Sequence, residues 1–477
     1  MTDGDTHLMM KKLMSLFGAQ DLTQGNTMRG LLQFSIPLLL GNFAQQLYNT
    51  VDSIIVGKYI GDNALAAVGA SLPIVNLLLV LFVGISTGAG IMVAQYFGAK
   101  DRKALSHTVG TTLTLTLAVS LLLTLVGTLA SPWLLRILKT PEEFIAQAEA
   151  YLVIYFAGFT GMAFYNIIAG ILRGMGDSVY PLFFLLISTV INIFLDIYFV
   201  ANLQLGVAGV AWATIIAQSL SAILCFGRLN KMRDVMDLNR KTLIPDRRLA
   251  MRLFMLGVPS GITQAIFSLS AIMVQSLANS LQTLTAVPVV ATTTAVMRVD
   301  GYCMLPNMTF GVAATTFVGQ NIGAGLLDRV RKGTRDALKV ALLCSCVMTL
   351  GIILFGKNLM ALFTDTPEVI DLGGRWMRIL AVGYIAFSIT QVLSGVMRGC
   401  GETVLPMWIS IITTVVIRLS LAYLLVYLSK SAEWPHGNPE ALQYSLLIAW
   451  ISGAVITTLV YKLGKWRKKA VVPTLNH

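Results

Sequence analysis

The sequence predicts an all-α, polytopic membrane protein with twelve transmembrane helices in two six-helix lobes. Three observations predict this fold class. First, 56% of the 477 residues are hydrophobic and only 12% are charged, whereas soluble chains carry about 25% charged residues. Second, apolar segments long enough to cross a bilayer recur along the whole chain. Third, one sequence signature occurs twice, once in each half.

The apolar segments number twelve, six in each half of the chain. Six crossings return a chain to the side of the membrane on which it began, so both halves enter the membrane in the same sense. We therefore expect parallel repeats, related by an axis along the membrane normal. The expected spans are 31–57, 66–97, 107–137, 144–172, 179–201, 206–228, 250–280, 287–322, 333–363, 370–397, 404–428 and 441–464.

The repeated signature is an Arg-Gly-x-Gly turn followed by an acid and, four residues later, a proline. It occupies Ile171–Pro181 and returns at Val396–Pro406, a shift of 225 residues. Further landmarks keep this shift, as Gly158 matches Gly383 and Gln95, Gly98 and Ala99 match Gln320, Gly323 and Ala324. Several landmarks at one shift indicate two structural halves, which is how many transporters build a site that opens alternately to either side.

Basic residues gather in alternate loops, in the linker after the sixth segment and at the end of the chain. The intervening loops Ala201–Gly206 and Leu281–Pro288 carry no charge. The positive-inside rule therefore places both termini and the linker in the cytoplasm, with the chain in the inner (plasma) membrane. Contact with anionic membrane lipids explains the net charge of +12, and no nucleic acid partner is expected.

This pattern divides the chain into five parts. They are a cytoplasmic N-terminal segment (1–30), an N-lobe with helices 1 to 6 (31–228), a cytoplasmic linker (229–248), a C-lobe with helices 7 to 12 (249–464) and a basic cytoplasmic tail (465–477). The linker is polar and basic, so we expect it to lie along the cytoplasmic surface as a tether.

Acidic side chains within the first six segments mark the candidate working site. Asn192 and Asp196 are four residues apart and share one face of the fifth segment. Thr214 lies in the sixth segment behind a run of small residues that permits close helix packing, and Asp52 lies in the first. Two carboxylates, an amide and a hydroxyl suit a hard cation such as Na⁺, or a proton. The alternative is polar contact between packed helices, but a charge at the bilayer centre costs roughly 3 kcal/mol.

The second half lacks this pair of polar residues. At the constant shift of 225, Asn192 corresponds to Ile417 and Asp196 to Leu421, and Arg418 lies nearby. A single coupling site in the N-lobe is the simplest interpretation.

Other polar residues in the segments are candidates for a substrate cavity, although each could equally serve helix packing. These candidates are Gln45, Tyr48, Asn49, Asn166, Gln264, Asp300 and Asn307. For Asp300, two interpretations stay open, a place in a C-lobe cavity or a structural ion pair with Arg418. Pro37 lies within the first segment, where it is either a static kink or a hinge.

No enzymatic chemistry is indicated. The four histidines and five cysteines show no metal-ligand spacing, and no nucleophile and base occur in a known arrangement, so no catalytic residue is expected. No Gly-Lys-Ser/Thr follows the Arg-Gly-x-Gly turns, so we expect no nucleotide site. We expect no cofactor beyond a coupling ion.

Together these residues make the chain resemble the multidrug and toxic compound extrusion (MATE) family of secondary transporters. The resemblance covers nearly the whole chain and is carried by Val51–Gly57, Leu172–Ser178, Asn192 with Asp196, Gly206–Thr214 and Phe317–Ala324. It implies two six-helix lobes in a V around a central cavity and cation-coupled export by Na⁺ or H⁺ antiport.

The resemblance also implies roles for single residues. The family's N-lobe cation site falls on Asp52, Asn192, Asp196 and Thr214, and Pro37 matches the bending proline of the DNA-damage-inducible-F-like branch. Some members place a Glu in the seventh helix for a C-lobe cation site, where this chain offers Gln264. This departure favours an N-lobe mechanism.

The expected function is secondary active export of amphipathic, often cationic, small molecules such as drugs or toxic metabolites, by a monomer that exchanges them for H⁺ or Na⁺. The alternative is a lipid-linked saccharide flippase of the same superfamily. Such flippases usually carry additional helices, so the count of twelve segments disfavours this alternative.

Overall fold

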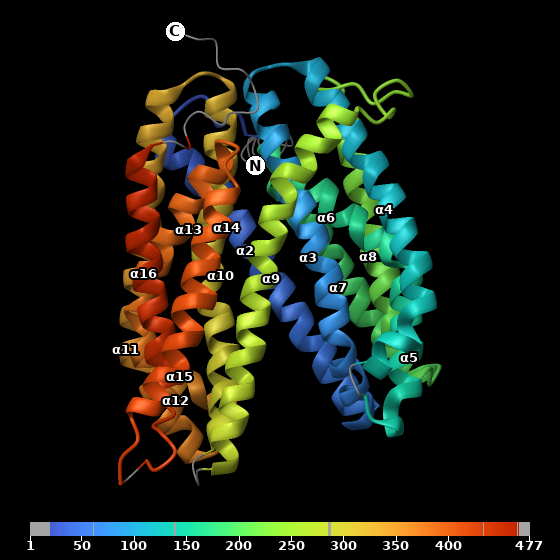
Figure 1. The fold of residues 1–477 in the computed structure, drawn as a ribbon. Coiled ribbons are helices and arrows are strands. Elements are labelled where there is room, and N and C mark those ends of the chain that lie inside the picture. Colours follow the sequence, from blue (N-terminus) through green and yellow to red (C-terminus); the bar gives the residue numbers. More distant parts are fainter. Residues whose placement is uncertain are drawn as a thin grey trace, which may run out of the picture. The chain divides into compact units, whose positions relative to one another are not determined.

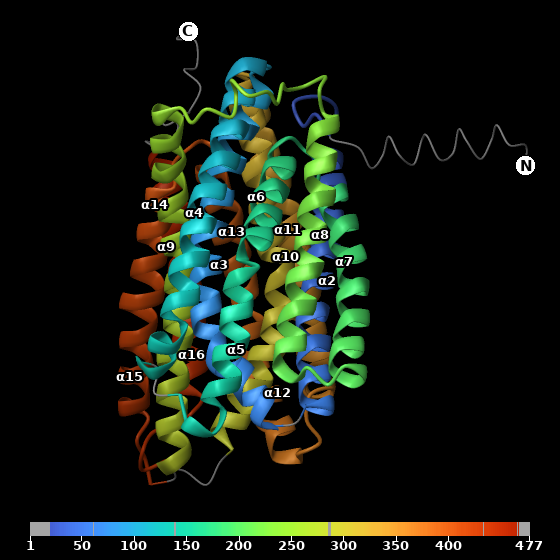
Figure 2. The ribbon, with the colours of Figure 1, turned by 90° about the vertical axis from the view of Figure 1, so that its right-hand side faces the viewer.

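The computed structural model describes residues 20–60, 62–137, 140–284, 288–432, 434–464 and 466. Within these ranges the chain is helical and contains no β-strand, as the apolar segments predict (Figures 1 and 2). The described residues fall into two compact units. The first unit contains the chain up to Gln24 and Leu32–Gly261, and the second contains Gly25–Leu31 and the chain from Ile262 onward.

The first unit is a bundle of six membrane-length segments, of which the fourth and fifth are each built from two helical pieces. Its elements are α2 (Thr27–Tyr59, of which the part up to Leu31 belongs to the second unit), α3 (Asp62–Gly98), α4 (Arg102–Ile137), α5 (Glu142–Ala157), α6 (Phe159–Gly174), α7 (Val179–Ile197), the π-helix η1 (Tyr198–Asn202) and α8 (Gly206–Lys231).

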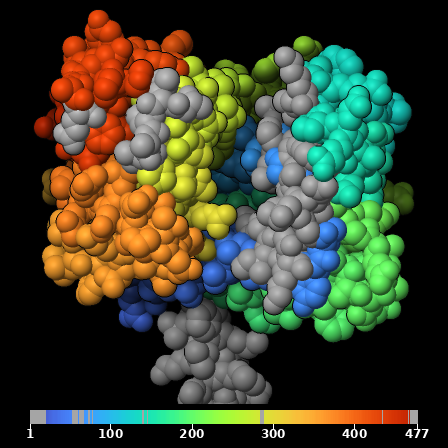
Figure 3. All heavy atoms as spheres, turned by 90° about the horizontal axis from the view of Figure 1, so that it is seen from below, coloured from blue at the N-terminus to red at the C-terminus, as the bar shows by residue number. Residues whose placement is uncertain are grey.

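The second unit repeats this order. Its elements are α9 (Arg247–Leu284, from Ile262), α10 (Val289–Gly323), α11 (Leu327–Ala361), α12 (Pro367–Ala381), α13 (Gly383–Gly399), α14 (Val404–Ser410), the π-helix η2 (Ile411–Ile417), α15 (Arg418–Leu428) and α16 (Ala441–Leu463). Seen end on in Figure 3, the orange surface of the α11–α12 region adjoins the red surface of the α15–α16 region, and α12 packs against α16.

Length and composition make the chain a multi-pass membrane protein. Eight helices of the described residues are long and apolar enough to cross a membrane, or ten if each of two bent pairs is one span. The bent pairs are α5 with α6, at 52°, and α12 with α13, at 47°. The bends fall at Gly158 and beside Gly383, the two glycines that the repeat matches at a shift of 225.

Small residues allow two helix pairs to touch backbone to backbone, at equivalent places in the two units. In the first, Gly170 and Gly174 of α6 face Ser86 and Gly90 of α3. In the second, Gly395 and Gly399 of α13 face Gly311 and Thr315 of α10. Each residue of the first contact matches its counterpart in the second at the shift of 225. Small side chains spaced four residues apart are typical of close helix packing in membranes.

The repeated Arg-Gly-x-Gly turns end α6 and α13 and begin the next helix. Gly176 and Gly401 adopt φ angles of +85° and +90°, a conformation that glycine reaches without strain. The acid that follows accepts backbone N–H groups of the next helix, Asp177 from Tyr180 and Glu402 from Val404 and Leu405. These turns therefore have a structural role in the described chain.

The linker between the halves is shorter and more firmly placed than its sequence predicts. It runs from residue 232 to 246, because α8 continues to Lys231 and α9 begins at Arg247. Asp237 pairs with Arg102 at 2.7 Å, and the Leu243 carbonyl accepts the Thr114 hydroxyl at 2.7 Å. A Cβ on Gly110 would lie 1.9 Å from the Thr242 carbonyl oxygen. The linker is therefore docked along α4.

The first helix of each half, α2 or α9, begins in one compact unit and continues into the other. At the start of α2, the Thr27 hydroxyl bonds to Asp336 and the Gly25 carbonyl accepts Arg329, all within the second unit. At the start of α9, Gly257 packs against Gly84 of α3 within the first unit. The two compact units therefore divide within α9, between Gly261 and Ile262.

Candidate functional site

The candidate site of the first unit is built on the inward face of α7. This helix turns apolar side chains such as Val190 and Phe194 outward, where they are 68% and 71% exposed. Its buried stripe contains Asn192 and Asp196, which are 1% and 0% exposed. Because one helical turn separates them, both point to the same side. An acid and an amide are thus held in the interior of the bundle.

The interior of this unit also contains two hydroxyl groups, those of Tyr48 in α2 and Thr214 in α8. Thr214 of α8 is 7% exposed, and the Tyr48 hydroxyl of α2 donates to its Oγ1 at 3.3 Å. The small residues at the start of α8 bring it close to the end of α7, where Gly209 lies against Phe199 and Leu205. Tyr48, one of the predicted cavity residues, is buried in the structure and bonded to Thr214.

The chemistry of these groups suits a small cation or a proton. Neither amide atom of Asn192 has a hydrogen-bond partner among the described residues, although the side chain is buried. A buried amide without a partner costs about 1–3 kcal/mol, so its presence calls for a reason. Carboxylate, amide and hydroxyl oxygens are the ligands that hard cations prefer. No group of three or more His, Cys, Asp or Glu side chains that could hold a metal occurs in the described part of the chain.

Two residues of the predicted sites cannot be placed by their side chains. Asp52 and Asn49 lie within α2, four residues and one residue after Tyr48, but their side chains fall outside the described set. Pro37 is buried within α2, which continues through it as one helix. The N-terminal segment before residue 20 and the tail after Trp466 also lie outside the described residues.

The remaining predicted cavity residues have different surroundings. Gln264 is exposed and Gln45 is half-buried. Asn166 is partly buried, and its amide donates to the Met162 carbonyl at 2.9 Å. Asn307 is fully buried, donates to the Tyr384 carbonyl at 3.3 Å and accepts the Ser345 hydroxyl at 2.8 Å. The amide of Asn307 is thus hydrogen-bonded on both sides to neighbouring helices.

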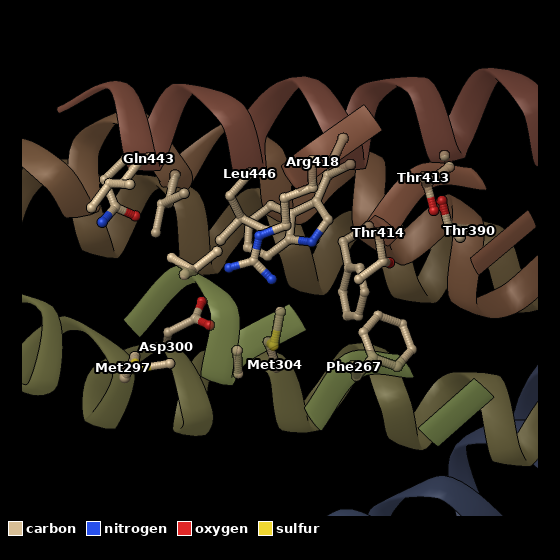
Figure 4. Close-up of a pocket in the computed structure, with 18 of the residues that line it drawn as sticks. Phe267, Met297, Asp300, Met304, Thr390, Thr413, Thr414, Arg418, Gln443 and Leu446 are labelled. Atoms are coloured by element: carbon tan, nitrogen blue, oxygen red, sulfur yellow. The ribbon is translucent and has the colours of Figure 1, made fainter. Parts of the chain in front are cut away.

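Asp300 does line a cavity, which lies wholly within the second unit. The cavity has a volume of about 200 Å³ and is bounded by α9, α10, α13, η2 and α16, with the ends of α12 and α14 and the start of α15. Figure 4 shows Asp300 and Arg418 on opposite walls with their charged ends directed toward each other. No ion pair within 4.0 Å joins them; instead Asp300 accepts the Tyr384 hydroxyl, and Arg418 donates to Ser270 at 3.1 Å. Of the two open interpretations of Asp300, the structure supports the cavity.

The π-helix η2 changes the register of the repeat, which the constant shift missed. Before η2 the shift is 225, as the buried Pro181 and Pro406 show. After η2 the shift is 226, because the burial pattern of Asp196 and Val200 recurs at Ala422 and Val426. A π-helical turn accommodates an additional residue. At the shift of 226, Arg418 corresponds to Asn192 and Ala422 to Asp196, in place of Ile417 and Leu421.

The fold and the polar interior define a class of protein, a two-unit helical membrane transporter. Comparison with known proteins then gives the family. The model of the MatE family matches residues 37–198 and 259–424, and the chain belongs to this family, the MATE transporters.

Relatives and solved structures agree over nearly the full length. The chain is 30% identical over 462 residues to the probable multidrug resistance protein YoeA of Bacillus subtilis, with 95% of this chain and 97% of that protein covered. It is 27% identical to the probable multidrug resistance protein NorM of Thermotoga maritima, covering 93% and 94%. A crystal structure of MATE in the straight conformation superimposes with a TM-score of 0.86 at 25% identity, covering 94% and 97%.

The similarity to the DNA damage-inducible protein F of Escherichia coli is 28% over 74% of this chain. It covers less of the chain than the similarity to YoeA does, so the expected placement in that branch is only weakly suggested.

Proposed function

We propose that this protein is a secondary active exporter of amphipathic, often cationic, small molecules, driven by the entry of H⁺ or Na⁺. Membership of the MATE transporters and the names of its relatives as multidrug resistance proteins support the exporter class. The observation that carries the coupling role is the fully buried Asn192 and Asp196 face of α7, with the Asn192 amide lacking a hydrogen-bond partner among the described residues.

In this proposal the coupling ion is a substrate that binds in the first unit. Asp196 and Asp52 supply negative charge, Asn192 supplies its amide oxygen, and Thr214 supplies a hydroxyl that Tyr48 positions through the 3.3 Å hydrogen bond. Binding of a cation or proton neutralises the carboxylates in a medium where isolated charge is costly. In this proposal α2 bends at Pro37 in response to this neutralisation, which links ion entry to substrate release by alternating access.

The test is substrate efflux from proteoliposomes under separately imposed sodium and pH gradients. Asp196→Asn keeps the shape of the side chain and removes its charge, so we expect gradient-driven efflux to fall to the level of empty liposomes, and the same for Asp52→Asn. Asp365→Asn is the matched control, because Asp365 is exposed in the loop between α11 and α12. Efflux at the wild-type rate by Asp196→Asn would refute the coupling site.

The proposal includes the setting in which the exporter works. We propose that it works as a monomer in the inner (plasma) membrane. The positive-inside rule supports cytoplasmic termini and basic loops that would face anionic lipid. Trypsin added to sealed, right-side-out vesicles should leave the linker intact, and cleavage there would contradict this orientation.

A further inference from the structure

The cavity of the second unit has walls suited to an organic molecule with an aromatic body. Three aromatic side chains line it, Phe267 of α9, Phe387 of α13 and Trp450 of α16. Met297, Met304 and Met308 of α10 complete the apolar wall, and methionine adapts readily to irregular shapes. Ligand pockets typically combine such walls with a few well-placed polar groups.

Two opposite charges face this cavity without meeting. Asp300 has one oxygen engaged with the Tyr384 hydroxyl, and Arg418 donates through one nitrogen to Ser270. The Arg418 Nε is buried and has no hydrogen-bond partner among the described residues. Since burying an ion without full compensation costs several kcal/mol, two separated charges in one cavity are expensive. They would be compensated by a molecule that presents a negative group to Arg418 and a positive group to Asp300.

Arg418 reaches the cavity wall directly after an irregular stretch of helix. Seven residues of π-helix, Ile411–Ile417, immediately precede it. Such π-helical turns are rare in proteins overall, but they occur frequently at functional sites. At the shift of 226 that the burial of Ala422 and Val426 indicates, Arg418 corresponds to Asn192 of the first unit. The same place in the repeat thus carries a neutral amide beside an acid in one unit and a guanidinium in the other. Guanidinium groups bind carboxylates in a planar, two-bonded geometry.

We propose that this cavity is a binding site for small zwitterionic molecules with an aromatic body, whose carboxylate pairs with Arg418 and whose ammonium group pairs with Asp300. Thr293, Thr413, Thr414 and Gln443 line the same cavity and offer further hydrogen bonds. The site lies within the second unit and is separate from the Asn192 and Asp196 face of the first.

The first test uses the unaltered, full-length protein in lipid nanodiscs and three probes with one aromatic body. Tryptophan carries both charges, tryptophan methyl ester only the ammonium group and indole-3-propionate only the carboxylate. Calorimetric titration should give tryptophan a Kd roughly tenfold or more below that of each singly charged probe, because each loses one charge-assisted hydrogen bond. The proposal would be overturned if tryptophan and either analogue bound with equal affinity, or if none of the three probes bound.

The second test assigns each charge to its partner. Arg418→Gln should weaken binding of tryptophan and indole-3-propionate roughly tenfold and leave the methyl ester unchanged. Asp300→Asn should weaken tryptophan and the methyl ester and leave indole-3-propionate unchanged. Arg298→Gln is the control, because Arg298 is an exposed base of α10 outside the cavity wall. A uniform loss for all three probes in either variant would refute the assignment, and the comparison of probes on wild-type protein does not depend on the variants folding.

This inference can fail independently of the proposed export function. Loss of gradient-driven efflux in Asp196→Asn with no tryptophan binding would leave the exporter standing and remove the zwitterion site. Selective tryptophan binding in a protein that shows no gradient-driven efflux would do the reverse.

Discussion

Replacing Gly395 by alanine tests the close contact between α13 and α10. A Cβ at Gly395 would lie 2.2 Å from the carbonyl oxygen of Gly311. That neighbour is backbone, so no side-chain rotation can relieve the overlap, and the two helices must separate by about 1 Å to reach ordinary contact. Overpacking of this kind costs typically about 1–3 kcal/mol, and we expect the upper end because the shift disturbs the whole seam.

The matched control is Gly351→Ala in α11, where a Cβ would meet nothing within 4 Å. Alanine gains up to about 1 kcal/mol of helix propensity over glycine at both positions, so the difference between the variants isolates the overpacking cost, about 3 kcal/mol. The assay is reversible unfolding in mixed micelles of dodecyl sulfate. Gly170→Ala should lose less, because its nearest neighbour is the Ser86 hydroxyl, which can rotate. If Gly395→Ala proves as stable as Gly351→Ala, the reasoning is refuted.

Two further outcomes are expected. Arg228→Gln should lower the free energy of unfolding by roughly 2 kcal/mol, less than for a fully buried pair, because it removes the 3.0 Å partner of buried Asp177. Burial raises the pKa of Asp177, although its hydrogen bonds and the charge of Arg228 act in the opposite direction. The Asp177 contribution to stability therefore falls as pH rises through that pKa. The loss of stability caused by Arg228→Gln should accordingly be larger at pH 8, where the carboxylate is charged, than at pH 4. An equal loss at both pH values in chemical unfolding would contradict this. Gly110→Leu should displace the linker from α4, because a Cβ at residue 110 would lie 1.9 Å from the Thr242 carbonyl oxygen. Trypsin should then cut the linker of the purified protein several times faster than in the control Gly227→Ala, whose Cβ meets nothing within 4 Å. Unchanged cleavage would show that the docking does not restrain the linker.

The sequence predicted the architecture because its signals are periodic and local. Long apolar segments define membrane helices by length alone, and landmarks at one shift define a repeat without any knowledge of contacts. The match of Gly158 with Gly383 anticipated two equivalent positions, and the structure adds that both are helix bends. The burial of Asn192 and Asp196 on one face also follows from their four-residue spacing.

The features that escaped prediction depend on contacts distant in sequence or on changes of helical period. The π-helix η2 leaves no mark in composition, so the constant shift matched Asn192 with Ile417, whereas the burial pattern after η2 indicates Arg418. Docking of the linker depends on Gly110 leaving room for the Thr242 carbonyl, which only the fold reveals. The amide of Asn307 was a plausible cavity group in sequence, but its partners lie 77 and 38 residues away.

The division of α2 and α9 between the units has a consequence for biosynthesis. When the ribosome has produced α8, the glycine face of α3 that receives α9 is still uncovered, because Gly257 and Gly261 have not yet been made. The first six spans therefore cannot complete their packing as they emerge. The second unit instead requires Thr27, one of the earliest helical residues, which must stay available to Asp336 until more than 300 further residues have been translated. The first unit thus needs the start of α9, and the second needs the start of α2, before its packing is complete.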